Sequence, residues 1–157
     1  MPFLFQGQSI RAAQTVEQLM DAFDAYSHAL AALVIFTLII LALSPFSALA
    51  KQKAGLAPGA TPQEDYAEKA YRLNRAYLNG CETLPAFLTV TLVAVLAGAA
   101  PFWVNLLASV VLVSRIVMIL IHLQGSGKPH GGLRSVFYVI GWACMAGLAL
   151  MALVAAI

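Results

Sequence analysis

The 157-residue chain is predicted to be an all-α protein, a transmembrane bundle of four helices in a single domain, and three observations predict this class. Hydrophobic residues make up 61% of the sequence and charged residues only 10%, as is typical of integral membrane proteins. The charges are clustered and leave uncharged runs at 25–50, 83–114 and 135–157. The middle run exceeds one span of about 20 residues, and the segment from Gly98 to Pro101 divides it into two helices.

The expected elements follow from these runs in chain order. Residues 10–24 are weakly amphipathic and are expected to form a short helix on the membrane surface. The transmembrane helices are expected at about 26–50, 62–98, 102–123 and 133–156. Thr61 is expected to cap the second of them, with Pro62 at its first position.

The basic residues predict how the helices are oriented. They flank the first and third connections: Lys51, Lys53, Lys69, Arg72, Arg75, Lys128 and Arg134. The second connection and the C-terminus carry no charge. By the positive-inside rule, the first and third connections face the cytoplasm and both termini lie on the non-cytoplasmic side.

A row of polar side chains lies on one face of the expected second helix: Glu68, Arg72, Arg75, Asn79 and Glu82. Steps of four and three residues place all five on one side of a helix. No charged residue follows Glu82 as far as Ser114, so Glu82 lies well below the membrane surface. Ionisable groups at that depth cost roughly 2.5–3.5 kcal/mol each, and this face is therefore where we expect the function.

Polar residues of the other helices converge on the same end of the bundle. The third helix contributes Arg115 and His122, and the fourth contributes Arg134, Ser135 and Tyr138. Because charges inside a membrane usually pair with one another, an ion pair between Glu82 and Arg115 is the first expectation.

The remaining arginines suit a small ligand that carries several carboxylates or a phosphate, because a guanidinium binds such groups through two parallel hydrogen bonds. Two alternatives stay open. Arg72 could instead extend to lipid headgroups, and the buried pair could be purely structural. The sequence contains no P-loop, no Rossmann glycine pattern, no hydrolase motif and no metal-ligand spacing.

These residues resemble a known family, the membrane-associated proteins of eicosanoid and glutathione metabolism (MAPEG). The run RAYLNGCETLPAF, from Arg75 to Phe87, resembles the second-helix signature of that family, Arg-Ala-x-x-Asn-x-x-Glu followed by proline. In VSRIVMILIHL, Arg115 occupies the position of the buried arginine of the family. LRSVFY, from Leu133 to Tyr138, is similar to the Arg-Ser-x-x-Tyr pattern of the prostaglandin E synthase branch.

The resemblance implies a homotrimer that binds glutathione between neighbouring subunits near the cytoplasmic face. Six residues would then hold glutathione: Arg72, Arg75, Asn79, Glu82, Arg115 and His122. Three would be catalytic: Arg134 as the electrostatic activator of the thiol, and Ser135 or Tyr138 as the hydrogen-bond donor to its sulfur. Glu82 would bind the ammonium group, and an apolar electrophile would arrive through the bilayer.

Two functions remain in competition. The first is a membrane-bound glutathione transferase or peroxidase that acts on hydrophobic electrophiles or lipid hydroperoxides. The second is a non-enzymatic lipid-binding or scaffold member of the same family. Leu78 stands where the prostaglandin E synthase branch has an arginine, Met118 where histidine or tyrosine is usual, and His122 where tyrosine is usual. These departures disfavour a prostaglandin or leukotriene synthase. A third possibility is that the polar face only holds the trimer together.

Overall fold

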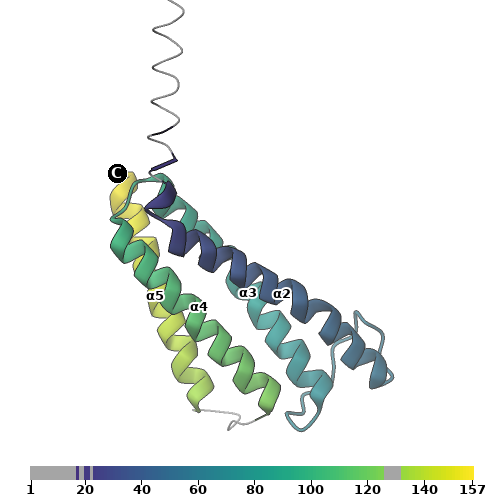
Figure 1. Cartoon of the computed structure of the whole chain (residues 1–157). Coiled ribbons are helices and arrows are strands. Elements are labelled where there is room, and N and C mark those ends of the chain that lie inside the picture. Colours follow the sequence, from purple (N-terminus) through teal and green to yellow (C-terminus); the bar gives the residue numbers. More distant parts are fainter. Residues whose placement is uncertain (1–16, 18–19, 22, 126–131) are drawn as a thin grey trace, which may run out of the picture.

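The computed structural model of the protein describes residues 17, 20–21, 23–125 and 132–157. Four long helices make up most of this part of the chain (Figure 1): α2 Ser27–Lys53, α3 Lys69–Leu96, α4 Pro101–Gln124 and α5 Leu133–Ala156. Each is long and apolar enough to cross a membrane, and the described residues include no strand. The predicted all-α transmembrane four-helix bundle is confirmed. The expected surface helix at 10–24 falls largely outside the described residues.

The start of α3 differs from the prediction, because the helix begins at Lys69 and not at Pro62. The carboxylate of Asp65 accepts a hydrogen bond from the backbone N–H of Ala67 at 2.8 Å. The N–H of Glu68 donates to the carbonyl of Asp65 at 3.1 Å. These local bonds form a turn that competes with the helix, as aspartate commonly does. Residues 54–68 are therefore a connection, and Thr61 caps nothing.

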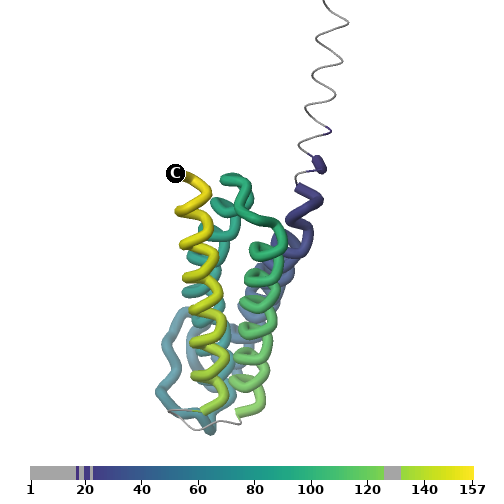
Figure 2. The backbone as a smooth tube through the Cα atoms, turned by 90° about the vertical axis from the view of Figure 1, so that its left-hand side faces the viewer, coloured from purple at the N-terminus to yellow at the C-terminus, as the bar shows by residue number. Residues whose placement is uncertain are grey.

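The helices run alternately up and down, so the start of α2 and the end of α5 lie at one end of the bundle (Figures 1 and 2). Small residues allow the helices to approach closely. A Cβ atom built at Gly80 of α3 would lie only 2.8 Å from Cγ1 of Ile40 in α2. Phe36 and Phe87 fill the core beside this contact, with ring centroids 6.1 Å apart in an edge-to-face arrangement.

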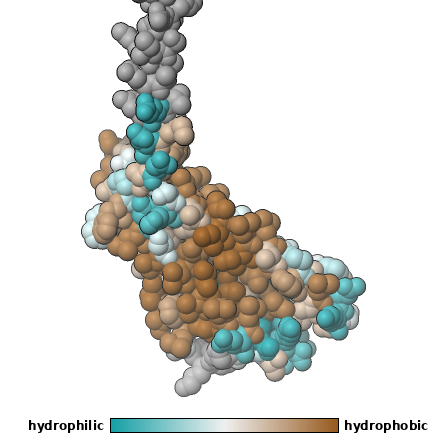
Figure 3. Space-filling view, in the orientation of Figure 1, coloured by the Kyte–Doolittle hydropathy of each residue, from teal (hydrophilic) through white to brown (hydrophobic). Residues whose placement is uncertain are grey.

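The outer surface of the bundle is predominantly apolar. Figure 3 shows hydrophobic residues covering the middle of the visible face and hydrophilic residues gathered toward its ends. Large side chains such as Leu41 and Leu153 are about 60% exposed, at 63% and 60%. A soluble protein rarely exposes so large an apolar area, whereas lipid is a suitable environment for it. The chain is an integral, multi-pass membrane protein.

Asn105 of α4 connects two helices at the end of the bundle that carries the α3–α4 turn. Its Oδ1 accepts the backbone N–H of Ala29 at 2.9 Å, and its Nδ2 donates to the carbonyl of Ala25 at 2.7 Å. Ala29 lies in the first turn of α2, where N–H groups lack partners within the helix. Asn105 therefore caps α2 from a neighbouring helix. Tyr26 strengthens this end by donating from its hydroxyl to the carbonyl of Ala99 at 2.6 Å.

Replacing Asn105 by alanine should destabilise the bundle. The substitution leaves the N–H of the fully buried Ala29 without an acceptor, at a cost of about 1–3 kcal/mol. The measurement is reversible unfolding in detergent, with the lipid-facing substitution Leu106→Ala as the control. A loss of stability no larger in Asn105→Ala than in the control would show that this cap is not needed.

Candidate functional site

A pocket of about 240 Å³ lies between α3, α4 and α5, at the end of the bundle that carries the 54–68 connection. Its walls are formed by Tyr66, Arg75, Asn79, Met118, His122, Arg134, Ser135, Tyr138 and Val139. Six of the nine residues predicted for the site are among them: Arg75, Asn79, His122, Arg134, Ser135 and Tyr138. The structure therefore brings together polar residues from three helices that are far apart in sequence.

Helical spacing explains how each wall is built. Arg75 and Asn79 are four residues apart on α3, as are Met118 and His122 on α4, so each pair lies on one face of its helix. Gly125 adopts a left-handed backbone with φ 68° and ends α4 soon after His122. The wall from α5 comes from its first two turns, which contain Arg134, Ser135 and Tyr138.

Arg115 lies behind the pocket rather than in its wall. Its side chain is only 3% exposed, and Nη1 lies 3.4 Å from Oδ1 of Asn79 and 3.5 Å from the sulfur of Met118. The guanidinium carbon lies 5.3 Å from the centre of the Tyr138 ring, within the range of a cation–π interaction. Arg115 thus contacts three residues that form the pocket wall, and it fixes their relative positions.

The predicted ion pair between Glu82 and Arg115 is wrong, and within the described part of the chain Arg115 binds neutral groups instead. Glu82 is exposed on α3. Arg72 and Glu82 mark the two edges of the polar face of α3. They lie about 80° apart around a helix with 3.6 residues per turn, so this face is wide. Asn79 lies nearer the edge that faces Arg115, and Glu82 lies at the opposite edge.

Gly141 of α5 allows Arg115 and its helix to lie close to α5. A Cβ atom at Gly141 would lie 2.5 Å from Oγ of Ser114 and 3.3 Å from Nε of Arg115. Real Cβ atoms do not come as close as 2.5 Å to another atom, so any residue other than glycine would require Ser114 to move. Gly141 follows Tyr138 by about one turn, so this contact also sets how Tyr138 lies against Arg115.

Tyr66 is a pocket residue that the sequence analysis did not identify. Its ring stacks on His122, with centroids 6.1 Å apart and planes 15° apart, and packs edge-on against Tyr71 at 5.2 Å. The guanidinium of Arg134 lies 5.0 Å from the centre of the same ring and donates a hydrogen bond to the Tyr66 hydroxyl. Tyr66 lies within the predicted second helix, and its aromatic character in a polar segment was the only available signal.

His122 is buried, at 4% exposed, and neither of its ring nitrogens has a hydrogen-bond partner among the described residues. Leaving buried polar atoms unpaired is costly, so such atoms usually mark a place where a partner is missing. Because His122 forms part of the pocket wall, a polar group of a bound ligand could supply that partner.

Arg72 and Glu82 do not form part of this pocket. Nη1 of Arg72 donates to the carbonyls of Tyr66 and Ala67 at 2.7 and 2.6 Å. Arg72 therefore holds the segment that carries Tyr66. Its place is in the wall of a different cavity, between α2, α3 and α4. Glu82 lies on the exposed side of α3, where the pocket does not reach.

The fold and the pocket define a class: a multi-pass membrane protein in which a cationic, hydroxyl-bearing pocket lies at one end of a four-helix bundle. The family model of the MAPEG family matches residues 27–154, and the chain belongs to this family. A search of curated proteins gave no significant match. Membership supports, in general terms, a membrane function related to glutathione.

Replacing Gly141 by alanine should displace Arg115 and destabilise the protein. The added methyl group overlaps Oγ of Ser114, and overpacking of this kind costs about 1–3 kcal/mol. The measurement is unfolding in detergent. A second substitution, Ser114→Ala, removes the overlapping oxygen and should restore much of the loss.

The matched control is Gly147→Ala on the same helix. A Cβ atom there would meet only the end of the Leu107 side chain, at 3.3 Å, and that flexible group can move aside. Equal stability of the two glycine variants would contradict the assignment of Gly141 as a close-contact position.

Proposed function

We propose that the protein is a membrane-bound glutathione transferase or peroxidase that acts on hydrophobic electrophiles or lipid hydroperoxides. One observation carries the proposal: Arg75, Asn79, His122, Arg134, Ser135 and Tyr138 surround a single pocket. Membership of the MAPEG family gives the general relation to glutathione. The more specific activity rests on the chemistry of these side chains.

The side chains suit the functional groups of glutathione, which are two carboxylates, one ammonium group and one thiol. Arg75 and Arg134 provide two guanidinium groups, each able to bind a carboxylate. The unpartnered nitrogens of His122 and the side-chain amide of Asn79 can bind the peptide groups. The carboxylate of Glu82 is exposed outside this pocket, and it would bind the ammonium group only where a neighbouring subunit brings the ligand to the outer side of α3.

Glutathione supplies a thiol, and the first turns of α5 can favour its reactive thiolate form. An unperturbed thiol has a pKa of about 8.5 and is mostly protonated at neutral pH. Arg134 places a positive charge in the pocket, and the hydroxyls of Ser135 and Tyr138 can donate hydrogen bonds to a sulfur anion. The helix start adds partial positive charge, because α5 begins at Leu133.

Tyr66 positions Arg134 before a ligand binds. Its hydroxyl accepts from the guanidinium and its ring packs under it. With a carboxylate or thiolate the guanidinium forms a hydrogen bond between two opposite charges, whereas the Tyr66 hydroxyl is neutral, so an anionic ligand can take the place of that hydroxyl. Arg134 would then exchange the Tyr66 hydroxyl for the ligand while its guanidinium stays in the pocket.

A neighbouring subunit would complete the pocket, and a homotrimer is the assembly that we propose. Tyr138 and Val139 form part of the pocket wall but are 47% and 58% exposed, so the pocket opens on the outside of the bundle. Glu82 is exposed as well. The exposed apolar side chains around this opening would let a hydrophobic substrate reach it from the bilayer.

Isothermal titration of the detergent-purified protein with glutathione tests the proposal directly. We expect saturable binding in the millimolar range or tighter. The variant Arg75→Ala, which removes one carboxylate partner from the pocket, should weaken binding about tenfold or more, the cost of a charge-assisted hydrogen bond. The absence of any heat of binding in the millimolar range would contradict the proposal.

Replacing Arg134 by alanine should remove the activation of the thiol. We expect loss of the ultraviolet absorbance of the bound thiolate and a fall in kcat/KM for a model electrophile of about 100-fold, the usual effect of removing one electrostatic group. Lys69→Ala, which removes a cation outside the pocket, is the control. Binding of glutathione without thiolate absorbance in the unmodified protein would favour the non-enzymatic alternative.

A further inference from the structure

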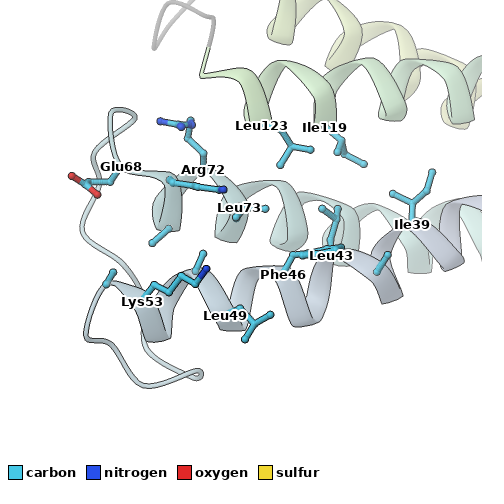
Figure 4. Close-up of a pocket in the computed structure, with 15 residues that line it drawn as sticks. Ile39, Leu43, Phe46, Leu49, Lys53, Glu68, Arg72, Leu73, Ile119 and Leu123 are labelled. Carbon is cyan, nitrogen blue, oxygen red and sulfur yellow. The ribbon is translucent and has the colours of Figure 1, made fainter.

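A second cavity lies on a different side of α4 from the polar pocket. It is a groove of about 880 Å³ between α2, α3 and α4 (Figure 4), within the usual size range of ligand-binding sites. Its apolar walls include Leu43 and Phe46 from α2, Leu73 from α3, and Ile119 and Leu123 from α4. None of the residues that surround the polar pocket forms part of this groove.

The groove has the length of one leaflet of the bilayer. On α2 its lining extends from Ile39 to Lys53, which corresponds to about 21 Å at 1.5 Å per residue. One leaflet is about 15 Å thick in its hydrocarbon part and about 20 Å thick with its headgroups. An acyl chain that enters at the headgroup level can therefore lie within the groove along its whole length. Phe46 is 60% exposed, so the groove is open toward the surrounding lipid.

The charged residues of the groove gather at one end. They are Lys53, Glu68, Lys69 and Arg72, whereas the rest of the lining is apolar. In Figure 4 the side chain of Lys53 extends between α2 and α3, and the carboxylate of Glu68 points away from the groove. Arg72 already binds two backbone carbonyls. The charge presented to an occupant is therefore positive and comes mainly from Lys53 and Lys69.

Lys53 and Lys69 are available to an occupant of the groove, whereas the neighbouring Lys51 is not. Lys51 is buried, and its Nζ donates to the carbonyl of Pro58 at 3.1 Å, which holds the 54–68 connection in place. Lys53 and Lys69 are exposed. The positive-inside rule predicts that this end of the bundle faces the cytoplasm, where anionic lipids are enriched and attract nearby basic residues by about 1 kcal/mol each.

We propose that the groove between α2, α3 and α4 binds one acyl chain of an anionic phospholipid of the cytoplasmic leaflet, with the lipid phosphate held by Lys53 and Lys69. The apolar walls select a hydrocarbon chain, and the cations at the end select a negative headgroup over a zwitterionic one. This site is independent of the glutathione pocket, and a protein that fails to bind glutathione would still bind the lipid.

Fluorescence quenching by lipids with brominated acyl chains tests this binding. The two native tryptophans, both exposed, are first replaced by Trp103→Phe and Trp142→Phe. A single reporter is then introduced by Phe46→Trp in the groove or by Leu41→Trp, which lies on the same helix outside it and is 63% exposed. Each protein is placed in vesicles of brominated phosphatidylglycerol or brominated phosphatidylcholine. The quenching of each reporter by the two lipids gives the affinity for phosphatidylglycerol relative to that for phosphatidylcholine at that position.

At Phe46→Trp we expect a preference for phosphatidylglycerol of about fivefold for each lysine that contacts the phosphate, and of about thirtyfold if both do, since 1 kcal/mol corresponds to a factor of about five. At Leu41→Trp we expect a ratio near one. Adding Lys53→Gln and Lys69→Gln should abolish the preference at Phe46→Trp. Glu68→Gln, which removes a carboxylate at the same end, should not lower it.

Two outcomes would overturn the proposal. Equal quenching by the two lipids at Phe46→Trp, or the same preference at both reporters, would mean that the groove does not select an anionic lipid. Protection of Phe46→Trp from both lipids would mean that a neighbouring subunit covers the groove. Circular dichroism confirms that each variant remains folded.

Discussion

The burial of Arg115 is the constraint on which the site depends. A guanidinium in the middle of a membrane helix cannot reach water, so the protein must surround it with groups that stabilise a positive charge. It does so with the Asn79 amide, the Met118 sulfur and the face of the Tyr138 ring. Gly141 makes room for this arrangement. Because these contacts come from three helices, a single buried charge holds α3, α4 and α5 in register.

The two faces of α4 serve two different environments. Met118 and His122 face the polar pocket, whereas Ile119 and Leu123 face the apolar groove. Between them lies a cavity of only about 10 Å³, bounded by Asn79 and Arg115 among others. Little more than one layer of side chains therefore separates the proposed glutathione site from the groove proposed for an acyl chain. Helical periodicity makes this possible, since neighbouring residues point to different sides.

Much of the fold could be predicted from the sequence, because the placement of charges leaves little choice in a membrane. The uncharged runs predicted all four helices, and six of the nine residues predicted for the site, including His122, which departs from the family pattern, lie around one pocket. The predicted start of α3 was wrong because the side chain of Asp65 stabilises a turn that hydrophobic periodicity does not reveal. The Glu82–Arg115 ion pair was wrong because a heptad spacing shows which residues share a face but not which edge turns inward. Tyr66 was assigned to the second helix, and its place in the pocket could not be predicted, since the path of a connection depends on tertiary contacts such as those of Arg72.

A cryo-EM structure of the protein in lipid nanodiscs with glutathione is the most direct test of whether this pocket is the site. We expect density for the tripeptide beside Arg75, Ser135 and Tyr138, with the guanidinium of Arg134 turned from the Tyr66 hydroxyl to the ligand. Arg115 should remain on Asn79 and Tyr138, because its role is to hold the walls. Density for glutathione elsewhere in the bundle, with Arg134 still bound to Tyr66 and the pocket closed, would contradict the proposed site.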